Sequence, residues 1–497
     1  MNLSKSKYCE AYQCKKMLWL EKHHPETADE TKNQAVLDNG TDVGVLAKSL
    51  FGDYIDIDFN EDLSQMLEAT RRVIEENDNC NITEASFLFD NNFCSVDILR
   101  KKGNKFEIYE VKSSTECKDI YIEDASYQYY VLKSLGYDVE RVCVVHLNSN
   151  YIRRGELELD KLFTVVDITD TAKKKETEVK QRINEIRKYM EQKEEPKDDI
   201  GLHCNKPYEC PYFAYCTRKL EKPNVFDIRL MRFSSKMKYY ERGIISFREL
   251  LDEKLNPKYL EQVDFEVNDK EPKIEKEKIK EFLDTLSYPL YFLDFETFQQ
   301  AIPEYDGLSP YDQIPFQYSL HYYDEEHKLH HKEFLAKPDI DPRRELAESL
   351  VRDIPLNVCT LAYNMSFEKN VIKSLAIEYP DLYNHLMNIH DHIQDLMVPF
   401  YNRNYYTRDM QGSYSIKYVL PALFPSDPSL NYHNLEEVHN GGEAMNAYAN
   451  MGSLTKEEQE RLRSNLLKYC GLDTYAMVKI FDRLIEVVED KKRLEKK

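Results

Sequence analysis

Two carboxylates, Asp294 and Glu296, lie inside the otherwise apolar stretch PLYFLDFETF. The large apolar residues predict a buried strand, and side chains two positions apart on a strand share one face. Two adjacent buried anions cost several kcal/mol unless a cation or hydrogen bonds compensate them. The pattern therefore predicts a central strand whose acids bind a divalent metal; an edge strand with two solvated acids is the alternative.

The chain is too long for one hydrophobic core, because 497 residues predict two or three domains. No apolar run approaches the roughly 18 residues of a membrane helix, and the N-terminal segment MLWL is too short for a signal peptide. We therefore expect a cytoplasmic protein that contacts no membrane and whose eleven cysteines are free or bind metal.

The charge argues mildly against a nucleic-acid-binding protein. The chain has 68 basic and 89 acidic side chains, a net charge of -21, and lacks the usual basic footprint. A nuclease can still hold phosphate through metal ions and a local basic groove. The local motifs therefore decide the function.

The fold class that we expect is α/β, with two mixed-sheet domains joined by a helical segment. The predicted domains are residues 1–220 and 286–497, with a helical connector at 221–285. Strands are predicted at 95–100, 106–112 and 140–148, and a charged surface helix is predicted from residue 171 to Pro196.

The C-terminal half contains two further candidate acids. Glu368 lies in the first turn of a helix predicted to begin near Ser366, where a capping acid is the alternative interpretation. Tyr469 and Asp473 are four residues apart and share one face of a helix.

Together, the order Asp-x-Glu, an acid at a helix start and Tyr-x-x-x-Asp resembles the DnaQ-like 3'-5' exonucleases of the Tyr-bearing DEDD subgroup, over about residues 286–490. The resemblance implies a ribonuclease-H-like domain with two divalent metals, Mg²⁺ or Mn²⁺, roughly 4 Å apart. It also implies a role for each matching residue. The metal ligands would be Asp294, Glu296, Glu368 and Asp473, and Tyr469 would orient the attacking water. The family usually has Asp where this chain has Glu368.

A segment between these motifs interleaves aromatic and basic residues, among them Tyr405, Arg408 and Lys417. Aromatic faces stack on unpaired bases while cations follow the phosphate backbone. We therefore predict that these residues bind a single strand; a place in the core is the alternative.

In the N-terminal half, a predicted hairpin carries Asp97 on its first strand and Glu110 and Lys112, two residues apart, on its second. An exposed, solvated Glu-Lys pair is the alternative. The arrangement resembles the PD-(D/E)XK nucleases, in which the acids bind a metal and the lysine polarises water or phosphate. This resemblance implies a restriction-endonuclease-like domain. The following segment, with Gln128, resembles the Gln-Tyr helix of the RecB-like members. The resemblance implies that Gln128 contacts the bound strand.

Four cysteines add a separate argument. Cys204, Cys210 and Cys216 are evenly spaced, and Cys14 lies near the N-terminus. The pattern resembles the RecB-like nucleases, such as AddB and CRISPR-associated exonucleases. In these proteins a 4Fe-4S cluster joins the N-terminal and C-terminal ends of the nuclease domain. A four-thiolate zinc site and free core cysteines are the alternatives, and Cys9 could replace Cys14.

In one respect the chain departs from these relatives, because Gly44 occupies the place of their metal-binding histidine. Glu84 or Asp42 could then supply the missing ligand. The whole arrangement resembles a bacterial fusion of the two nuclease types. We therefore expect a nuclease that acts on DNA ends or single strands, in repair, mobile-element processing or defence; an RNA exonuclease and a non-catalytic nucleic-acid-binding scaffold are the alternatives.

Overall fold

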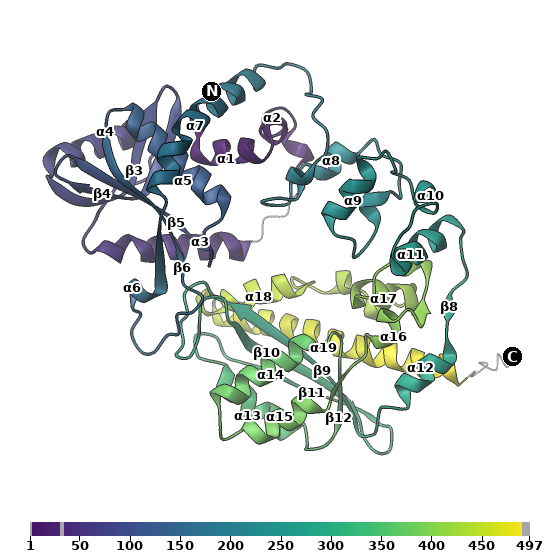
Figure 1. Cartoon of the computed structure of the whole chain (residues 1–497). Helices are drawn as coiled ribbons and strands as arrows, with labels where there is room; N and C mark the ends of the chain where they lie inside the picture. Colours follow the sequence, from purple (N-terminus) through teal and green to yellow (C-terminus); the bar gives the residue numbers. More distant parts are fainter. Residues whose placement is uncertain (1, 30–33, 490–497) are drawn as a thin grey trace. The chain divides into compact units, whose positions relative to one another are not determined.

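The computed structural model describes residues 2–29 and 34–489. The chain divides into two compact units (Figure 1). Unit 1 comprises Met1–Lys219 and Gln300–Asp312, and unit 2 comprises Leu220–Gln299 and Gln313–Lys497. Both units are α/β with mixed sheets, which confirms the expected fold class at this level. Among the described helices, none has both the length and the apolar character needed to cross a bilayer.

Unit 1 is built on a seven-stranded sheet in the order β2-β3-β4-β5-β6-β7, with β1 paired to β4. β3, β4 and β5 form an antiparallel meander, whereas β6 runs parallel to β5 because helix α5 returns the chain between them. The strands are β1 Leu3–Ser4, β2 Ile55–Asp56, β3 Asn79–Phe89, β4 Asn92–Lys102, β5 Lys105–Lys112, β6 Asp138–Leu147 and β7 Phe163–Asp167.

Strand alternation separates the two cores of unit 1. On β5, Ile108 packs in the core that contains α5, and Tyr109 packs in the core that contains α3. Glu110 and Lys112 share the face of Ile108 and therefore project towards α5. The helices are α1 Lys5–Gln13, α2 Lys15–His23, α3 Gln34–Ala47, α4 Leu63–Glu76, α5 Asp119–Ser134, α6 Leu159–Leu162, α7 Thr169–Tyr189 and α8 Phe213–Thr217.

Unit 2 has a five-stranded sheet in the order β11-β10-β9-β12-β13 and a small β14-β8 ladder. β10 is antiparallel to β9 and β11, whereas β12 is parallel to β9 and β13. The stretch with Asp294 and Glu296 is thus the central strand, and the edge-strand alternative is wrong. The strands are β8 Lys273–Ile274, β9 Leu290–Gln299, β10 Gln313–Tyr323, β11 Leu329–Leu335, β12 Cys359–Ala362, β13 Ile393–Asp395 and β14 Tyr405–Tyr406.

The long helix α19 runs along one face of this sheet, next to β9 and β10 (Figure 1). Leu290 and Phe292 of β9 pack in the core that contains α19, and Leu293 and Phe295 pack in the core that contains α13, α14 and α15. The helices are α9 Phe233–Tyr240, α10 Phe247–Leu250, α11 Pro257–Val267, α12 Lys276–Leu283, α13 Arg343–Asp353, α14 Ser366–Glu378, α15 Tyr383–Asp391, α16 Val398–Tyr401, α17 Ile416–Leu423, α18 Gly441–Ala449 and α19 Lys456–Val488. The helices α9 to α12 lie within the segment predicted as a connector.

Candidate metal centres

The acids of β9 lie on the face of the sheet that α19 covers. Asp294 and Glu296 share this face with Leu290 and Phe292 because strand side chains alternate. Ligand atoms of Asp294, Glu296 and Cys470 all lie within 4.8 Å of one another. Cys470 belongs to α19, and its Sγ is 3.9 Å from Asp294 Oδ2. Sheet and helix therefore contribute to one cluster.

Asp473 joins the same cluster from the next turn of α19. Its Oδ1 accepts a 2.6 Å hydrogen bond from the hydroxyl of Tyr432, and Tyr469 lies one turn earlier with its ring 6.0 Å from that of Tyr432. Burial raises the pKa of Asp473 to about 6, although hydrogen bonds from Tyr432 and Tyr469 act to lower it. The predicted Tyr-x-x-x-Asp pair thus faces one site.

Glu368 reaches the cluster from the first turn of α14. Its side chain is buried, and its Oε2 has no hydrogen-bond partner among the described residues. Burial raises its pKa to about 8. Burial also raises the pKa of Asp294, and the neighbouring Asp473, Glu296 and Glu368 raise it further, in that order. The charge of Glu368 therefore acts on Asp294.

No Lys, Arg or His of the described residues forms an ion pair with these four acids. Their carboxylates come from three separate segments, β9, α14 and α19. An uncompensated buried carboxylate takes up a proton or binds a cation. Carboxylate oxygens are ligands that Mg²⁺ and Mn²⁺ prefer, and the unpartnered Glu368 Oε2 is free to be one. The donor set fits a divalent metal.

A pocket of about 660 Å³ opens beside the acids, and Tyr432, Tyr469 and Asp473 form part of its wall. The rest of the wall is mainly apolar and includes Leu420 and Phe424, with Lys417 as a basic group. This size is typical of small-ligand sites. Lys417 acts to lower the pKa of Asp473, which places its charge near the cluster.

The predicted strand-binding segment is only partly available to a ligand. Tyr405 is 4% exposed and packs in the core between the sheet and α19, so the prediction that it stacks on bases is wrong. Arg408 pairs with Asp269 at 2.5 Å on the surface. Of the three predicted residues, Lys417 alone lines the pocket beside the acids.

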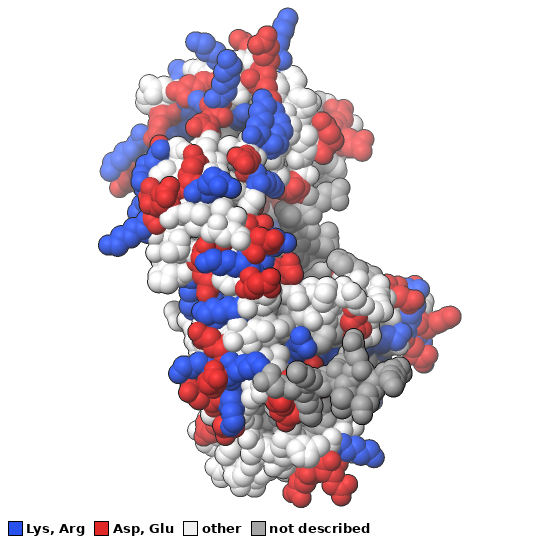
Figure 2. Space-filling model, turned by 90° about the vertical axis from the view of Figure 1, so that its right-hand side faces the viewer, with Lys and Arg blue, Asp and Glu red and all other residues white. Residues whose placement is uncertain are grey.

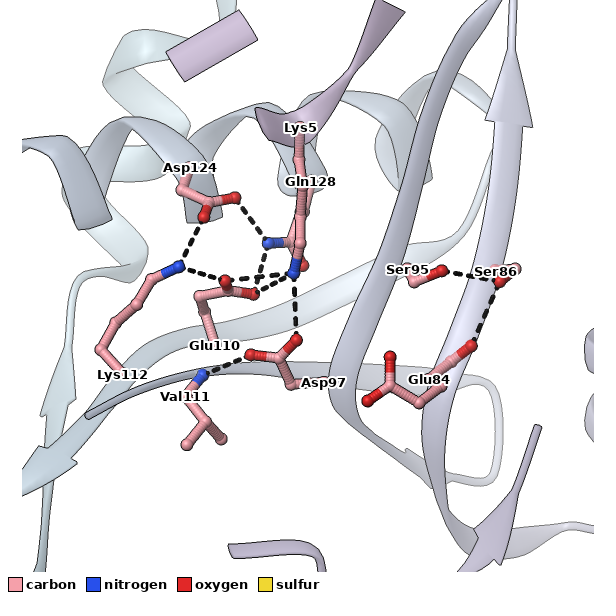
Figure 3. Close-up of polar contacts among 10 residues, drawn as sticks. All are labelled: Lys5, Glu84, Ser86, Ser95, Asp97, Glu110, Val111, Lys112, Asp124 and Gln128. Carbon is pink, nitrogen blue, oxygen red and sulfur yellow. Dashed lines mark hydrogen bonds and ion pairs between the residues drawn. The ribbon is translucent and has the colours of Figure 1, made fainter. Parts of the chain in front are cut away.

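In unit 1, Asp97 of β4 and Glu110 of β5 share one ammonium group, that of Lys5 (Figure 3). The Lys5 Nζ donates to Asp97 Oδ1 at 3.0 Å and to both oxygens of Glu110 at 3.1 Å. The other oxygen of Asp97 accepts from the backbone N–H of Val111 at 2.7 Å. The two predicted acids therefore converge, and Lys5 of α1 bridges them.

Lys112 and Gln128 contact the same carboxylate of Glu110. Lys112 Nζ donates to Glu110 Oε1 at 2.6 Å and to Asp124 Oδ2 at 2.7 Å. Gln128 Nε2 donates to Glu110 Oε2 at 2.6 Å and to Asp124 Oδ1 at 3.0 Å. Burial acts to lower the pKa of Lys112, but Glu110 and Asp124 outweigh it and raise that pKa. Because Glu110 is 1% exposed, the alternative of a solvated Glu-Lys pair is wrong.

Of the two acids considered as a replacement ligand, Glu84 lies near this group (Figure 3). It stands opposite Asp97 in the β3-β4 register, since Thr83 pairs with Ile98 and Ala85 with Val96. Its φ of 56° is unusual for a residue with a side chain. Burial raises its pKa, as does the charge of Asp97. Asp42 is exposed on α3, and within the described ranges no contact joins it to this group.

The four predicted cysteines meet around one small cavity in unit 1. It is lined by Cys14, Cys204, Cys210 and Cys216. Gln13 Nε2 donates 2.8 Å hydrogen bonds to the carbonyls of His203 and Tyr208, so the N-terminal helix is fastened to the later cysteine segment. Cys9 is not part of this cavity wall. Burial raises the pKa of its thiol, and the charged groups that also affect this pKa are Asp124, Lys112, Glu110 and Lys5.

On one face of the molecule the charged side chains are mixed rather than concentrated. Figure 2 shows basic and acidic side chains intermingled on the face that it presents. Lys5, Lys112 and Lys417 instead place basic groups next to acidic clusters. Any recognition of phosphate therefore depends on a few local cations.

Four residues of these sites were not predicted from the sequence. Asp124 precedes Gln128 by one helical turn, so its spacing could have identified it. Cys470 precedes Asp473 by three residues on one helix, so its helical spacing could also have identified it. Lys5 and Tyr432 reach their sites by tertiary folding, and nothing in the spacing indicates them.

The chain is similar over residues 291–415 to the family described as "Domain of unknown function (DUF2779)". That segment contains Asp294, Glu296 and Glu368 but ends before Tyr432 and Asp473. No curated protein matches the chain. No solved structure matches it either.

Proposed function

We propose that the protein is a metal-dependent nuclease with two active sites, a DnaQ-like 3'-5' exonuclease site in unit 2 and a PD-(D/E)XK site in unit 1. The observation that carries the proposal is the cluster of Asp294, Glu296 and Cys470, whose ligand atoms lie within 4.8 Å of one another. The charges of Asp473 and Glu368 also act on Asp294, and the four acids have no ion-pair partner among the described residues. The sheet of unit 2, with its acids on a central strand, is compatible with a ribonuclease-H-like domain.

In unit 2, Asp294, Glu296, Glu368 and Asp473 would hold Mg²⁺ or Mn²⁺. A metal bound by them neutralises developing charge and lowers the pKa of a water ligand. Tyr432 fixes the carboxylate of Asp473 by its hydrogen bond. Tyr469 offers a hydroxyl that can orient the attacking water, and the adjoining pocket can accept the terminal nucleoside of a strand.

In unit 1, Asp97 and Glu110 would hold the metal. Lys112 contacts Glu110 and can donate to a phosphate oxygen or orient a water. Asp124 and Gln128 keep Lys112 and Glu110 in place through their hydrogen bonds. Two sites in one chain suit the degradation of DNA that has ends or single-stranded segments.

The cysteine cavity supports a 4Fe-4S cluster within this proposal. Four thiolates can hold either a 4Fe-4S cluster or a zinc ion, and the zinc site is the alternative. The cluster would join α2 and the segment 201–217, which are far apart in the chain.

The test is an assay of the full chain, purified without oxygen, on end-labelled single-stranded and duplex DNA and RNA with Mg²⁺ or Mn²⁺. D294N should reduce stepwise 3' shortening by at least about 100-fold, and K112M should reduce the remaining cleavage by a similar factor. D409N and K133M alter exposed side chains and serve as matched controls.

If neither D294N nor K112M reduces cleavage of any substrate, the proposal is wrong. Faster cleavage of RNA than of DNA would assign the C-terminal site to RNA. Nucleic-acid binding without turnover, unaffected by D294N, would support a non-catalytic scaffold instead.

A further inference from the structure

The ammonium group of Lys5 lies where it contacts both metal-binding acids proposed for unit 1. It is 3.0 Å from Asp97 Oδ1 and 3.1 Å from each carboxylate oxygen of Glu110 (Figure 3). The side chain of Glu110 is 1% exposed, and that of Lys5 is 21% exposed. A divalent ion held by Asp97 and Glu110 would need these same oxygens, since Asp97 Oδ2 already accepts from the backbone N–H of Val111. Lys5 and such an ion are therefore alternatives.

Contacts of the residues on both sides of Lys5 fix its backbone position. The preceding Leu3 pairs with Asn92 of β4 and is buried, and its carbonyl accepts a 2.5 Å hydrogen bond from the hydroxyl of Tyr127. Ser4 caps α1 by accepting from the backbone N–H of Lys7. One turn later, Tyr8 stacks on Tyr127 with ring centroids 4.7 Å apart. These anchors on both sides of Lys5 keep its backbone next to the two acids.

The shared oxygens favour exchange over coexistence. A divalent ion on Asp97 Oδ1 and Glu110 would lie beside the Lys5 ammonium, which is within 3.1 Å of the same atoms. Like charges that share ligand oxygens at about 3 Å repel strongly in a partly buried site. A bound ion would therefore drive the Lys5 ammonium out.

We infer that Lys5 is an internal cation that occupies the N-terminal metal site and that a divalent metal must displace to bind Asp97 and Glu110. The inference rests on the function proposed for this site. Lys5 holds the two acids together when no metal is bound and weakens the apparent metal affinity. Once displaced, its ammonium is available to an anionic phosphodiester, so substrate and metal favour each other's binding.

The first test measures Mn²⁺ affinity by the electron paramagnetic resonance signal of free Mn²⁺. It uses the full chain with D294N and D473N, which removes the C-terminal site. K5M in this background should bind Mn²⁺ at least about tenfold more tightly, because the competing charged hydrogen bonds are lost. K7M changes a neighbouring lysine whose ammonium is 3.6 Å from the partly exposed Glu21, and should leave the affinity unchanged.

D97N in the same background should abolish this binding. If D97N abolishes it and K5M leaves it unchanged or weaker, the inference fails while the metal role of Asp97 stands. If D97N has no effect, both the inference and the metal site proposed for unit 1 fail.

A second test uses the unmutated side chains and does not depend on whether K5M folds. An amine-acetylating reagent followed by mass spectrometry should modify Lys5 slowly in the presence of a chelator and several-fold faster with saturating Mn²⁺. Lys7 serves as the internal control and should react equally in both conditions. Equal modification of Lys5 with and without Mn²⁺ would overturn the inference.

Discussion

The hydroxyl of Tyr432 donates a 2.6 Å hydrogen bond to Asp473 across 41 residues of sequence. Tyr432 belongs to a short helical turn, whereas Asp473 lies in the middle of α19. The contact fixes one carboxylate oxygen of Asp473. Tyr432 is therefore a positioning residue of the cluster in unit 2.

Replacing Tyr432 by Phe should weaken Mn²⁺ binding at unit 2 and slow exonuclease turnover, each by about tenfold, because a hydrogen bond to a charged group is lost. Calorimetric titration and the 3' end-labelled assay measure the two effects. Y418F is the control, since the Tyr418 hydroxyl makes no hydrogen bond to a described residue. Unchanged Mn²⁺ affinity in Y432F would show that the contact does not position a ligand.

The metal-free protein should lose stability as the pH rises from about 4.5 to about 8. Burial raises the pKa of Glu368 from 4.5 to about 8, so in this interval the folded state retains a proton that the unfolded state has lost. The contribution of Glu368 to stability is full below pH 4.5 and disappears as the pH passes its folded pKa. The urea concentration at the midpoint of unfolding, measured in the presence of a chelator, should fall as the pH rises through this range.

In E368Q this fall should be shallower, because the titrating carboxyl is gone. E325Q changes an exposed acid and should retain the slope of the parent. A parent whose urea midpoint rises with pH over this interval would contradict the assignment.

The four cysteines should act as one unit. Serine at Cys14 or Cys216 should remove absorbance near 400 nm and bound iron, whereas C9S and C80S should retain both, because Cys9 and Cys80 lie outside the cavity wall. Absorbance spectra and iron analysis of protein purified without oxygen measure this. A colourless parent with stoichiometric zinc would assign the site to zinc.

Arg182 should be important for the stability of unit 1. It donates to the buried Glu123 at 2.6 Å, and Lys175 pairs with the same carboxylate at 2.5 Å. R182M leaves Glu123 with only one of its two cationic partners, Lys175, and should lower the free energy of unfolding by about 3 kcal/mol. Chemical denaturation measures the change. Adding E123Q to R182M should recover part of this loss. R71M removes an exposed ion pair and should change the free energy of unfolding little.

Local sequence patterns determined much of the fold. The apolar run around Asp294 predicted the strand β9, and the period of two in its side chains put Asp294 and Glu296 on one face. The helix start near Ser366 and the helix that carries Tyr469 and Asp473 were also evident, because turn and periodicity signals act over a few residues. The strands of the hairpin with Asp97 and Glu110 followed from the same kind of signal.

Only the tertiary structure decided which of these residues meet and what surrounds them. Tyr405 resembles a strand-binding residue in sequence, yet it is 4% exposed in the core that also contains β9 and α19. Lys5 is 92 residues from Asp97, and Tyr432 is 41 residues from Asp473, so no local period encodes either contact. A sequence pattern specifies which face a side chain occupies, whereas its partners depend on how separate elements pack.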